Sequence, residues 1–516
     1  MHIKTFAVLL GFSIGITVGK IFLYATEIAL TFCLLGVLQL CLLHYERKGE
    51  QSGGVKNDDD EHFVHRHFSL PLLSGLFFIS IFLGIVRIQF VEEKNNFACE
   101  KVCEVSATIS SSPKVQDENQ TFVVTPTAIS DTYDILIKAP LYPRYQKGDE
   151  IVLLGKIQEA KHAYQHGERK FFDYNTYLRI HGIGSEMVYP KIRMIQKNNS
   201  RSITALLEHV REKSVSTISL YVSSPAASLA TGMLFGISSM SKELVTTFRV
   251  AGLSHIVVVS GFNIAILVSV IFSLFIFLPL MLRIVFSACV VVLFVIMVGG
   301  ETSIIRASCM SCIALGALAV GRGYAAKQAL LLSLFAIVVY QPEHLLYDAS
   351  LHLSFLATAG IVYMSEGLQS SLGNIKSVTY REIIVTTFAA YVMTLPYSMY
   401  AFGSISVYAL IANLTVLPLV PFAMLLTCVT VLVSVFSTTL ATMFGHATTL
   451  LINWILGVAH FVEGLPLASF PIVISLQTML ILYCVIIVLF ILFTNKKKNE
   501  TSGTKSTFPV SDVISY

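Results

Sequence analysis

Ionisable and hydrogen-bonding side chains interrupt four strongly apolar stretches in the second half of the chain. The stretches span 251–266, 299–310, 341–361 and 395–421, and their candidate channel-lining or gating residues are His255, Ser260, Asn263, Glu301, Arg306, Asp348, His352 and Asn413. An ionisable group at bilayer depth is costly unless it faces a partner or water. The fourth stretch also contains Pro396, Pro418 and Pro421, which predict broken helices. Broken helices are tolerated there only inside protein or around a water-filled cavity. Together the stretches indicate a hydrophilic path through membrane helices.

Each of these residues also has a simpler structural explanation. His255 alone fits a hydrogen-bonded contact between helices. Glu301 and Arg306 follow Gly299 and Gly300, so both fit a loop at the end of a span. Asp348 and His352 are spaced i,i+4 and would share one helical face, where they can pair with each other. Asn413 fits a cap at a helix break.

The composition places the chain in a membrane. Of its 516 residues, 54% are hydrophobic and only 13% are charged, against about 25% charged in soluble domains. The charge is unevenly distributed: 29 Asp, Glu, Lys and Arg residues fall in 92–201, whereas 383–462 contains none. We therefore expect a polytopic α-helical membrane protein with a small extracytoplasmic all-β domain inserted after three transmembrane helices.

The predicted organisation has four parts. Residues 1–91 contain three apolar spans (5–24, 26–44 and 69–91) and a polar linker at 45–68; residues 92–200 form the soluble domain, 201–494 the polytopic region and 495–516 a basic tail. The first span resembles a secretory signal, but no A-x-A site follows it, so we expect an uncleaved anchor. Four Lys/Arg residues in the linker and Lys496–Lys498 in the tail place both on the cytoplasmic side, which puts the soluble domain outside.

The soluble domain has the pattern of a small β-barrel. Short β-branched runs at 101–110, 121–129, 133–139 and 149–157 are separated by Pro, Gly and polar residues, which favours an OB-like fold. Basic and aromatic residues are interleaved in its second half, as in proteins that bind single-stranded nucleic acid. The candidate DNA contacts are Lys138, Arg144, Lys147, Tyr164, Arg169, Lys170 and Phe171. An ordinary solvated face over core aromatics explains the same pattern.

Cys99 and Cys103 lie in this domain. They cannot be bridged within one extended strand, because their Cα atoms would be too far apart; a disulfide between them requires the chain to turn there. The other seven cysteines lie in apolar segments, where a thiol behaves as a small hydrophobic group.

The polar stretches resemble the competence segment of ComEC-type DNA-uptake channels, bacterial membrane proteins that admit single-stranded DNA during transformation. The matching motifs are Gly252-Leu253-Ser254-His255 with Ser260-Gly261; Ser303 with Arg306-Ala307 and Met310; Leu353-Ser354-Phe355 with Ala357 and Gly360; and Leu395-Pro396, Phe402-Gly403, Asn413 and Pro418. The soluble domain resembles the family's OB-like domain at Phe172-Asp173-Tyr174, Tyr177-Leu178 and His181-Gly182-Ile183. The resemblance covers roughly 70–494.

The chain departs from the family pattern at several positions. Asn263 stands where a histidine is common, His352 where glutamine is usual, and Gln341 where an acidic residue is usual. Many relatives end in a metallo-β-lactamase-like nuclease domain with an H-x-H-x-D-H motif, but here His65-Arg66-His67 continues as Phe-Ser. We therefore expect the form without that domain, with no metal site, no cofactor and no enzymatic activity.

The resemblance implies a channel in the bacterial inner membrane that imports single-stranded DNA during natural transformation. It also implies partners: a periplasmic or surface DNA receptor, a cytoplasmic DNA-translocating ATPase and a separate nuclease. A transporter or exporter of another solute is the alternative. An intramembrane hydrolase using Ser260 and His255 is disfavoured, because an i,i+5 spacing puts the two residues about 140° apart on a helix.

Overall fold

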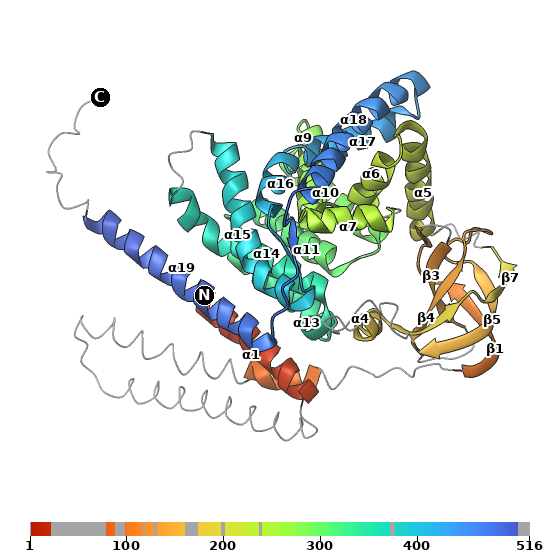
Figure 1. Cartoon of the computed structure of the whole chain (residues 1–516), viewed down its shortest axis with the longest axis horizontal. Helices are drawn as coiled ribbons and strands as arrows, with labels where there is room; N and C mark the ends of the chain where they lie inside the picture. The colour runs from red at the N-terminus through yellow and green to blue at the C-terminus, as the bar shows by residue number, and fades with distance from the viewer. Residues whose placement is uncertain are drawn as a thin grey trace.

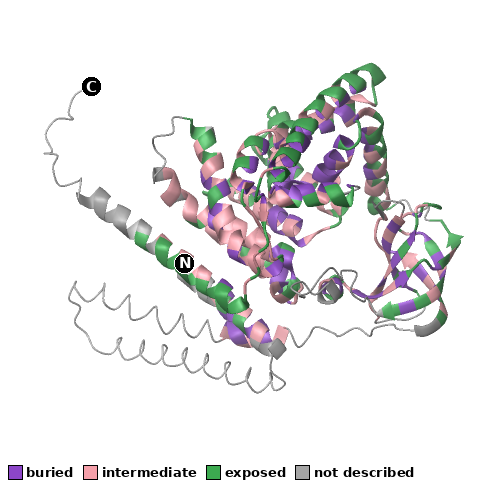
Figure 2. Cartoon of the chain, viewed as in Figure 1, coloured by how far each residue is buried: buried purple, intermediate pink, exposed green. Residues whose placement is uncertain are grey.

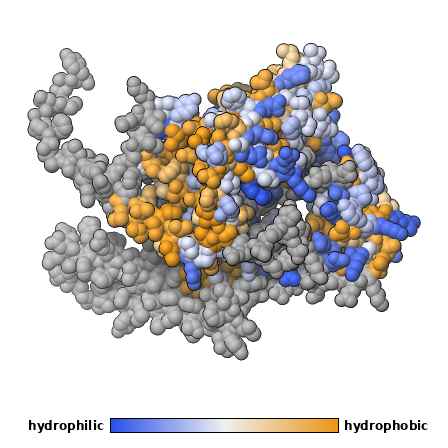
Figure 3. Space-filling view, viewed as in Figure 1, coloured by the Kyte–Doolittle hydropathy of each residue, from blue (hydrophilic) through white to orange (hydrophobic). Residues whose placement is uncertain are grey.

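A β-barrel and a larger helical region make up the computed structural model (Figure 1). The structure describes residues 2–21, 79–87, 99–116, 119–127, 132–159, 174–197, 202–236, 240–257, 259–371 and 377–503. Hydrophobic residues dominate the visible surface of the helical region, whereas hydrophilic ones gather on the barrel and beside it (Figure 3). This distribution agrees with the uneven charge of the sequence.

Two N-terminal helical segments cross with almost no space between their backbones. They are α1, His2–Ile21, and residues 79–87. A Cβ on Gly15 would collide with the carbonyl oxygen of Ile81, and one on Gly84 with that of Phe12. Two of the three predicted N-terminal spans therefore contain helix that packs together. The predicted span 26–44 and the linker 45–68 lie outside the described residues.

The predicted barrel is present. Its strands are β1 Cys99–Ile109, β2 Lys114–Gln116, β3 Asn119–Pro126, β4 Asp134–Pro140, β5 Glu150–Glu159, β6 Ile183–Val188 and β7 Lys191–Gln196, with the short helix α4, Tyr174–Ile180, before β6. Pairing runs β1-β3-β4-β6-β5 and closes because β5 also pairs with β1; only β4 and β6 are parallel. The four strands expected from sequence correspond to β1, β3, β4 and β5.

Strand alternation explains why these residues form a barrel. β3 and β4 bury every second side chain, including Phe122, Val124, Ile135 and Ile137, all at most 1% exposed. These side chains fill the barrel interior. Cys103 is disulfide-bonded, and the register of β1 shifts between Cys99 and Val102, so the strand is not regularly extended there.

The helical region contains fifteen elements within the described residues. They are α5 Ile203–Tyr221, α6 Ala226–Phe235, α7 Lys242–Val250, α8 Ser254–Val257, α9 Gly261–Leu274, α10 Leu280–Val298, α11 Thr302–Ala319, α12 Ala326–Tyr340, α13 His344–Tyr347, α14 Ala349–Ser371, α15 Val378–Ala401, α16 Ala409–Val416, α17 Val420–Val433, α18 Thr438–Glu463 and α19 Leu476–Gly503. Two short strands, β8 Ile405–Ser406 and β9 Ser469–Phe470, pair with each other.

Several of these helices are long and apolar enough to span a membrane. They include residues 280–298, 302–319, 380–401 and 438–463, and α16 with α17 would form one further span, bent by 45°. The predicted break in 395–421 is confirmed, although it falls after Ala401 and between α16 and α17, whereas α15 continues through Pro396. The structure fits a multi-pass membrane protein.

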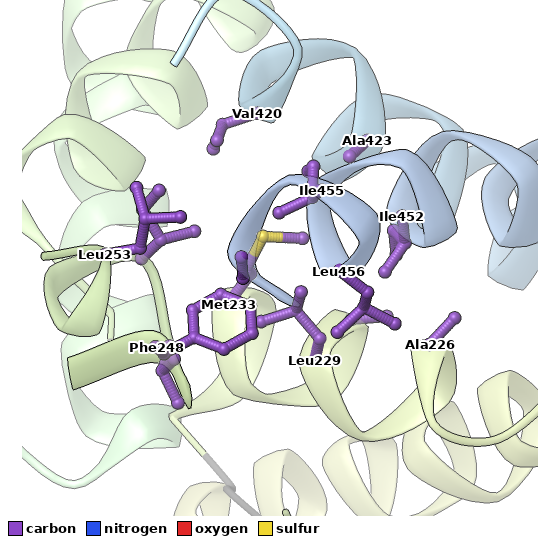
Figure 4. Close-up of a cluster of buried hydrophobic side chains, with 14 of the residues drawn as sticks. Ala226, Leu229, Met233, Phe248, Leu253, Val420, Ala423, Ile452, Ile455 and Leu456 are labelled. Atoms are coloured by element: carbon purple, nitrogen blue, oxygen red, sulfur yellow. The ribbon is translucent and has the colours of Figure 1, made fainter. Parts of the chain in front are cut away.

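The largest core joins the two ends of the helical region. Leu229 and Met233 of α6 and Phe248 of α7 pack against Ile452 and Ile455 of α18 (Figure 4). Buried residues concentrate along these inward helix faces (Figure 2). Helices α5 and α18 approach closely because Gly445 has no side chain: a Cβ there would collide with the Tyr221 carbonyl oxygen.

Polar contacts tie the other parts to this helical region. Arg87 donates from Nε to the Val339 carbonyl oxygen (2.7 Å) and from Nη2 to that of Tyr340 (2.8 Å), which caps the end of α12. On the barrel, the Gln146 amide donates to the Glu212 carboxylate of α5 at 3.1 Å. Burial, with Glu208 nearby, raises the pKa of Glu212.

Candidate functional site

Asp348 lies at the centre of a buried polar group. Its side chain is fully buried, and its Oδ2 accepts a hydrogen bond from the Thr302 hydroxyl and lies 3.0 Å from His344 Nδ1. Its Oδ1 accepts from the backbone N–H groups of Ser350 (2.8 Å) and Leu351 (3.3 Å). Asp348 therefore caps the start of α14 and links it to the first turn of α11.

Arg306 lies one turn further along α11 and is only 5% exposed. Its Nε and Nη2 donate to the Ser354 hydroxyl of α14 at 3.0 and 2.8 Å, and Nη1 lies 3.2 Å from the Met310 sulfur. A Cβ on Gly261 would lie 3.1 Å from Nη2, so the first residue of α9 packs directly beside the guanidinium. Three helices from three of the four stretches thus meet at Arg306.

Ser260 and Asn263 interact at the start of α9. The Ser260 hydroxyl donates to Asn263 Oδ1 at 3.2 Å, and Asn263 Nδ2 donates to the Met233 carbonyl oxygen of α6 at 2.9 Å. Asn263 is buried, at 4% exposed. This pair fixes the N-terminus of α9, the end that lies beside Arg306.

His352 belongs to a separate pair on α14. Its Nδ1 lies 2.8 Å from the Tyr397 hydroxyl of α15, and its Nε2 lies 2.7 Å from the Leu345 carbonyl oxygen. The alternative that His352 pairs with Asp348 is therefore wrong. Asp348 precedes α14 as its cap and turns its carboxylate toward α11, so the two side chains do not share a helical face.

The barrel domain reaches this site through α4 and the residue after it. The Gln341 amide donates to the Ile180 carbonyl oxygen, and the rings of His181 and His344 form a T-shaped pair with centroids 5.4 Å apart. Figure 1 shows α4 between the barrel and α13. His344 therefore contacts His181 of the barrel domain through its ring and Asp348 through Nδ1.

Three predicted residues lie apart from these contacts. Gly252, with φ +73°, turns the chain into α8, where His255 is exposed. Glu301 is the N-cap residue of α11, without a side-chain cap, so the loop-end explanation holds for Glu301 and fails for Arg306. Asn413 is not a cap: it lies within α16, buried, and its Oδ1 has no hydrogen-bond partner in the structure.

The barrel candidates divide into two groups. Lys138 on β4 and Arg144 and Lys147 in the β4–β5 loop are exposed, and the Arg144 guanidinium lies 5.7 Å from the centre of the Tyr142 ring. Tyr164, Arg169, Lys170 and Phe171 lie outside the described residues.

Sequence reasoning missed the partners that hold the site together. Thr302, His344, Ser354 and Tyr397 make the cross-helix contacts. Ser354 stands inside a quoted family motif and His344 inside a polar stretch, but neither carries a local signal of its contact. Within the described residues, no cluster of three or more His, Cys, Asp or Glu side chains could hold a metal ion.

A small β-barrel attached to several long apolar helices fits the architecture of a multi-pass membrane protein. The chain belongs to the competence protein family, whose model matches residues 233–497. ComE operon protein 3 of Bacillus subtilis (strain 168) is 24% identical over 361 residues, which cover 68% of this chain and 44% of that relative. The chain thus spans less than half of the relative's length. No solved structure matches the chain.

Proposed function

We propose that the chain forms a channel through which single-stranded DNA crosses the bacterial inner membrane during natural transformation. One observation carries the proposal: residues from three distant polar stretches, Arg306, Ser354 and Gly261, meet inside the helical region. A phosphodiester chain cannot enter hydrocarbon, so its passage requires such a polar interior. Membership of the competence family supports this substrate.

In this proposal the barrel lies outside the cytoplasm and guides the strand. The disulfide at Cys103 supports that location, because disulfides persist in oxidising compartments. Five-stranded barrels of this kind commonly bind single strands, and Lys138, Arg144 and Lys147 are exposed for contact with phosphates. A surface receptor would deliver the strand, and a separate cytoplasmic ATPase and nuclease would pull and prepare it.

Deletion and complementation test the proposal. Removing the gene from a transformable host should abolish transformation by linear DNA, and the full chain supplied in trans should restore it. Electroporated plasmid gives the control, since it bypasses the uptake route. A deletion strain that imports labelled DNA into the cytoplasm at the normal level would contradict the channel function.

Transport of another solute is the second candidate, favoured by the 45° break between α16 and α17. Broken helices form the substrate sites of many secondary transporters. Liposomes containing the purified chain separate the candidates, because only the channel should pass a labelled oligonucleotide under an imposed potential.

A further inference from the structure

Arg306 is a buried cation with no counter-ion among the residues that the structure describes. The residue is 5% exposed, and within the described part of the chain its guanidinium bonds the Ser354 hydroxyl and the Met310 sulfur. In the described part of the chain no carboxylate lies within 4.0 Å of it, although Arg211 is paired in this way with Glu208. A hydroxyl and a thioether supply dipoles but no negative charge, so the positive charge stays uncompensated.

Asp348, the acidic residue in the neighbouring contacts between α11 and α14, is already engaged. Asp348 binds Thr302, one turn before Arg306, but its two oxygens are used by Thr302, His344 and the first amides of α14. It therefore fixes the helices and leaves the Arg306 charge to a different anion.

The N-terminus of α9 is a second positive group, and it lies beside the guanidinium. Gly261 is the first residue of α9, a helix of 14 residues, and a side chain there would press against Nη2. The N-cap residue Ser260 makes no capping bond, because its hydroxyl donates to Asn263 instead. The positive end of the helix dipole therefore lies beside the buried guanidinium. Helix N-termini and arginine forks are both well suited to bind phosphate.

We infer that Arg306, with the N-terminus of α9, forms a binding site for one phosphodiester group of the strand in transit, an inference that rests on the proposed channel function. In the empty protein Ser354 holds the guanidinium. When a phosphate arrives, the fork exchanges the hydroxyl for two phosphate oxygens, and it returns to Ser354 as the strand advances. A single binding site neutralises one phosphate at a time, which permits release as well as binding.

The block of ionic current by a single-stranded oligonucleotide, measured with the purified full chain in planar bilayers, tests this phosphate-binding site. Arg306→Gln should raise the half-blocking concentration at least about tenfold, since a charge-assisted bond contributes ~1.5–3 kcal/mol. Arg306→Lys should show a smaller rise, because it keeps the charge and loses the fork. Arg249→Gln is the matched control: it removes the same charge from an exposed position on α7 and should leave the block unchanged.

A strand with uncharged methylphosphonate linkages shows whether the phosphate itself is bound. The wild-type chain should bind it at least as weakly as Arg306→Gln binds the normal strand, and the Gln variant should distinguish the two strands less than the wild-type chain does. Equal half-blocking concentrations for wild type and a folded Gln variant would overturn the inference.

If Arg306→Gln fails to fold, Arg306→Lys provides the test. The inference requires that Arg306→Lys raise the half-blocking concentration only for the charged strand. An equal rise for both strands overturns it. Absence of any strand-dependent block in the wild-type chain would instead refute the proposed channel function.

Discussion

The Thr302 hydroxyl donates a hydrogen bond to the buried carboxylate of Asp348, and this contact joins the first turn of α11 to the start of α14. The two helices carry Arg306 and Ser354, whose contact lies one turn further along both. Asp348 thus sets the alignment on which the Arg306 contact depends.

Replacing Asp348 with alanine should destabilise the helical region by about 3 kcal/mol, because it removes the α14 cap and leaves Thr302 and His344 without their buried acceptor. Asp348→Asn should cost about half as much, since Oδ1 can still cap. Thermal unfolding in detergent measures the effect. Glu301→Gln is the control, as Glu301 makes no side-chain cap, and an equal loss in both variants would refute this role for Asp348.

Two glycines of α18 should respond oppositely to alanine. Gly445→Ala should destabilise the protein by about 2 kcal/mol or more, since its Cβ would collide with the Tyr221 backbone. Gly457→Ala should stabilise it slightly, by up to ~1 kcal/mol, because that position is open and alanine favours the helix. Similar unfolding temperatures for the two variants would contradict the close packing of α5 and α18.

The contact between Gln341 and Ile180 should hold the barrel domain against the helical region. Gln341→Ala should accelerate amide hydrogen exchange in 174–181 several-fold. Exchange in β3 and β4 provides the internal control, because their amides bond within the barrel. Unchanged exchange in 174–181 would show that this contact does not restrain α4.

Neutralising Lys138, Arg144 and Lys147 together should weaken binding of single-stranded DNA to the full chain. Each lost phosphate contact reduces the slope of log K against log salt by about 0.7, so the triple Gln variant should lose roughly 2. Titration at several salt concentrations gives the slope. An unchanged slope would show that these residues belong to an ordinary solvated surface and do not contact phosphates.

Cys103 should report the side on which the barrel lies. In intact cells, a membrane-impermeant maleimide should label it only after an external reductant opens its disulfide. Lys497→Cys, in the basic tail, should be labelled only after the cells are permeabilised. Labelling of both positions from the same side would refute the proposed orientation.

Local patterns predicted much of the fold and little of the site's connectivity. β-Branched alternation located β1, β3, β4 and β5, since each strand buries one face. It did not predict the parallel pairing of β4 with β6, which joins residues about fifty apart in the sequence. Arg306 was predicted because a charge in an apolar stretch is conspicuous, whereas Ser354 is an ordinary helical serine until α11 packs beside it.

The error at Asp348 and His352 has the same origin. Their i,i+4 spacing predicted one shared helical face, but Asp348 caps the helix instead of lying in it. A short acidic side chain before Ala349-Ser350-Leu351 is also a cap signal, and spacing alone does not distinguish the two arrangements.

The crossing of α1 with residues 79–87 at Gly15 and Gly84 brings two points of the chain nearly seventy residues apart into backbone contact. Closing a loop costs free energy that grows only with the logarithm of its length. An insertion or deletion within the predicted polar linker at 45–68 should therefore change the free energy of this crossing only slightly, provided both glycines stay as they are.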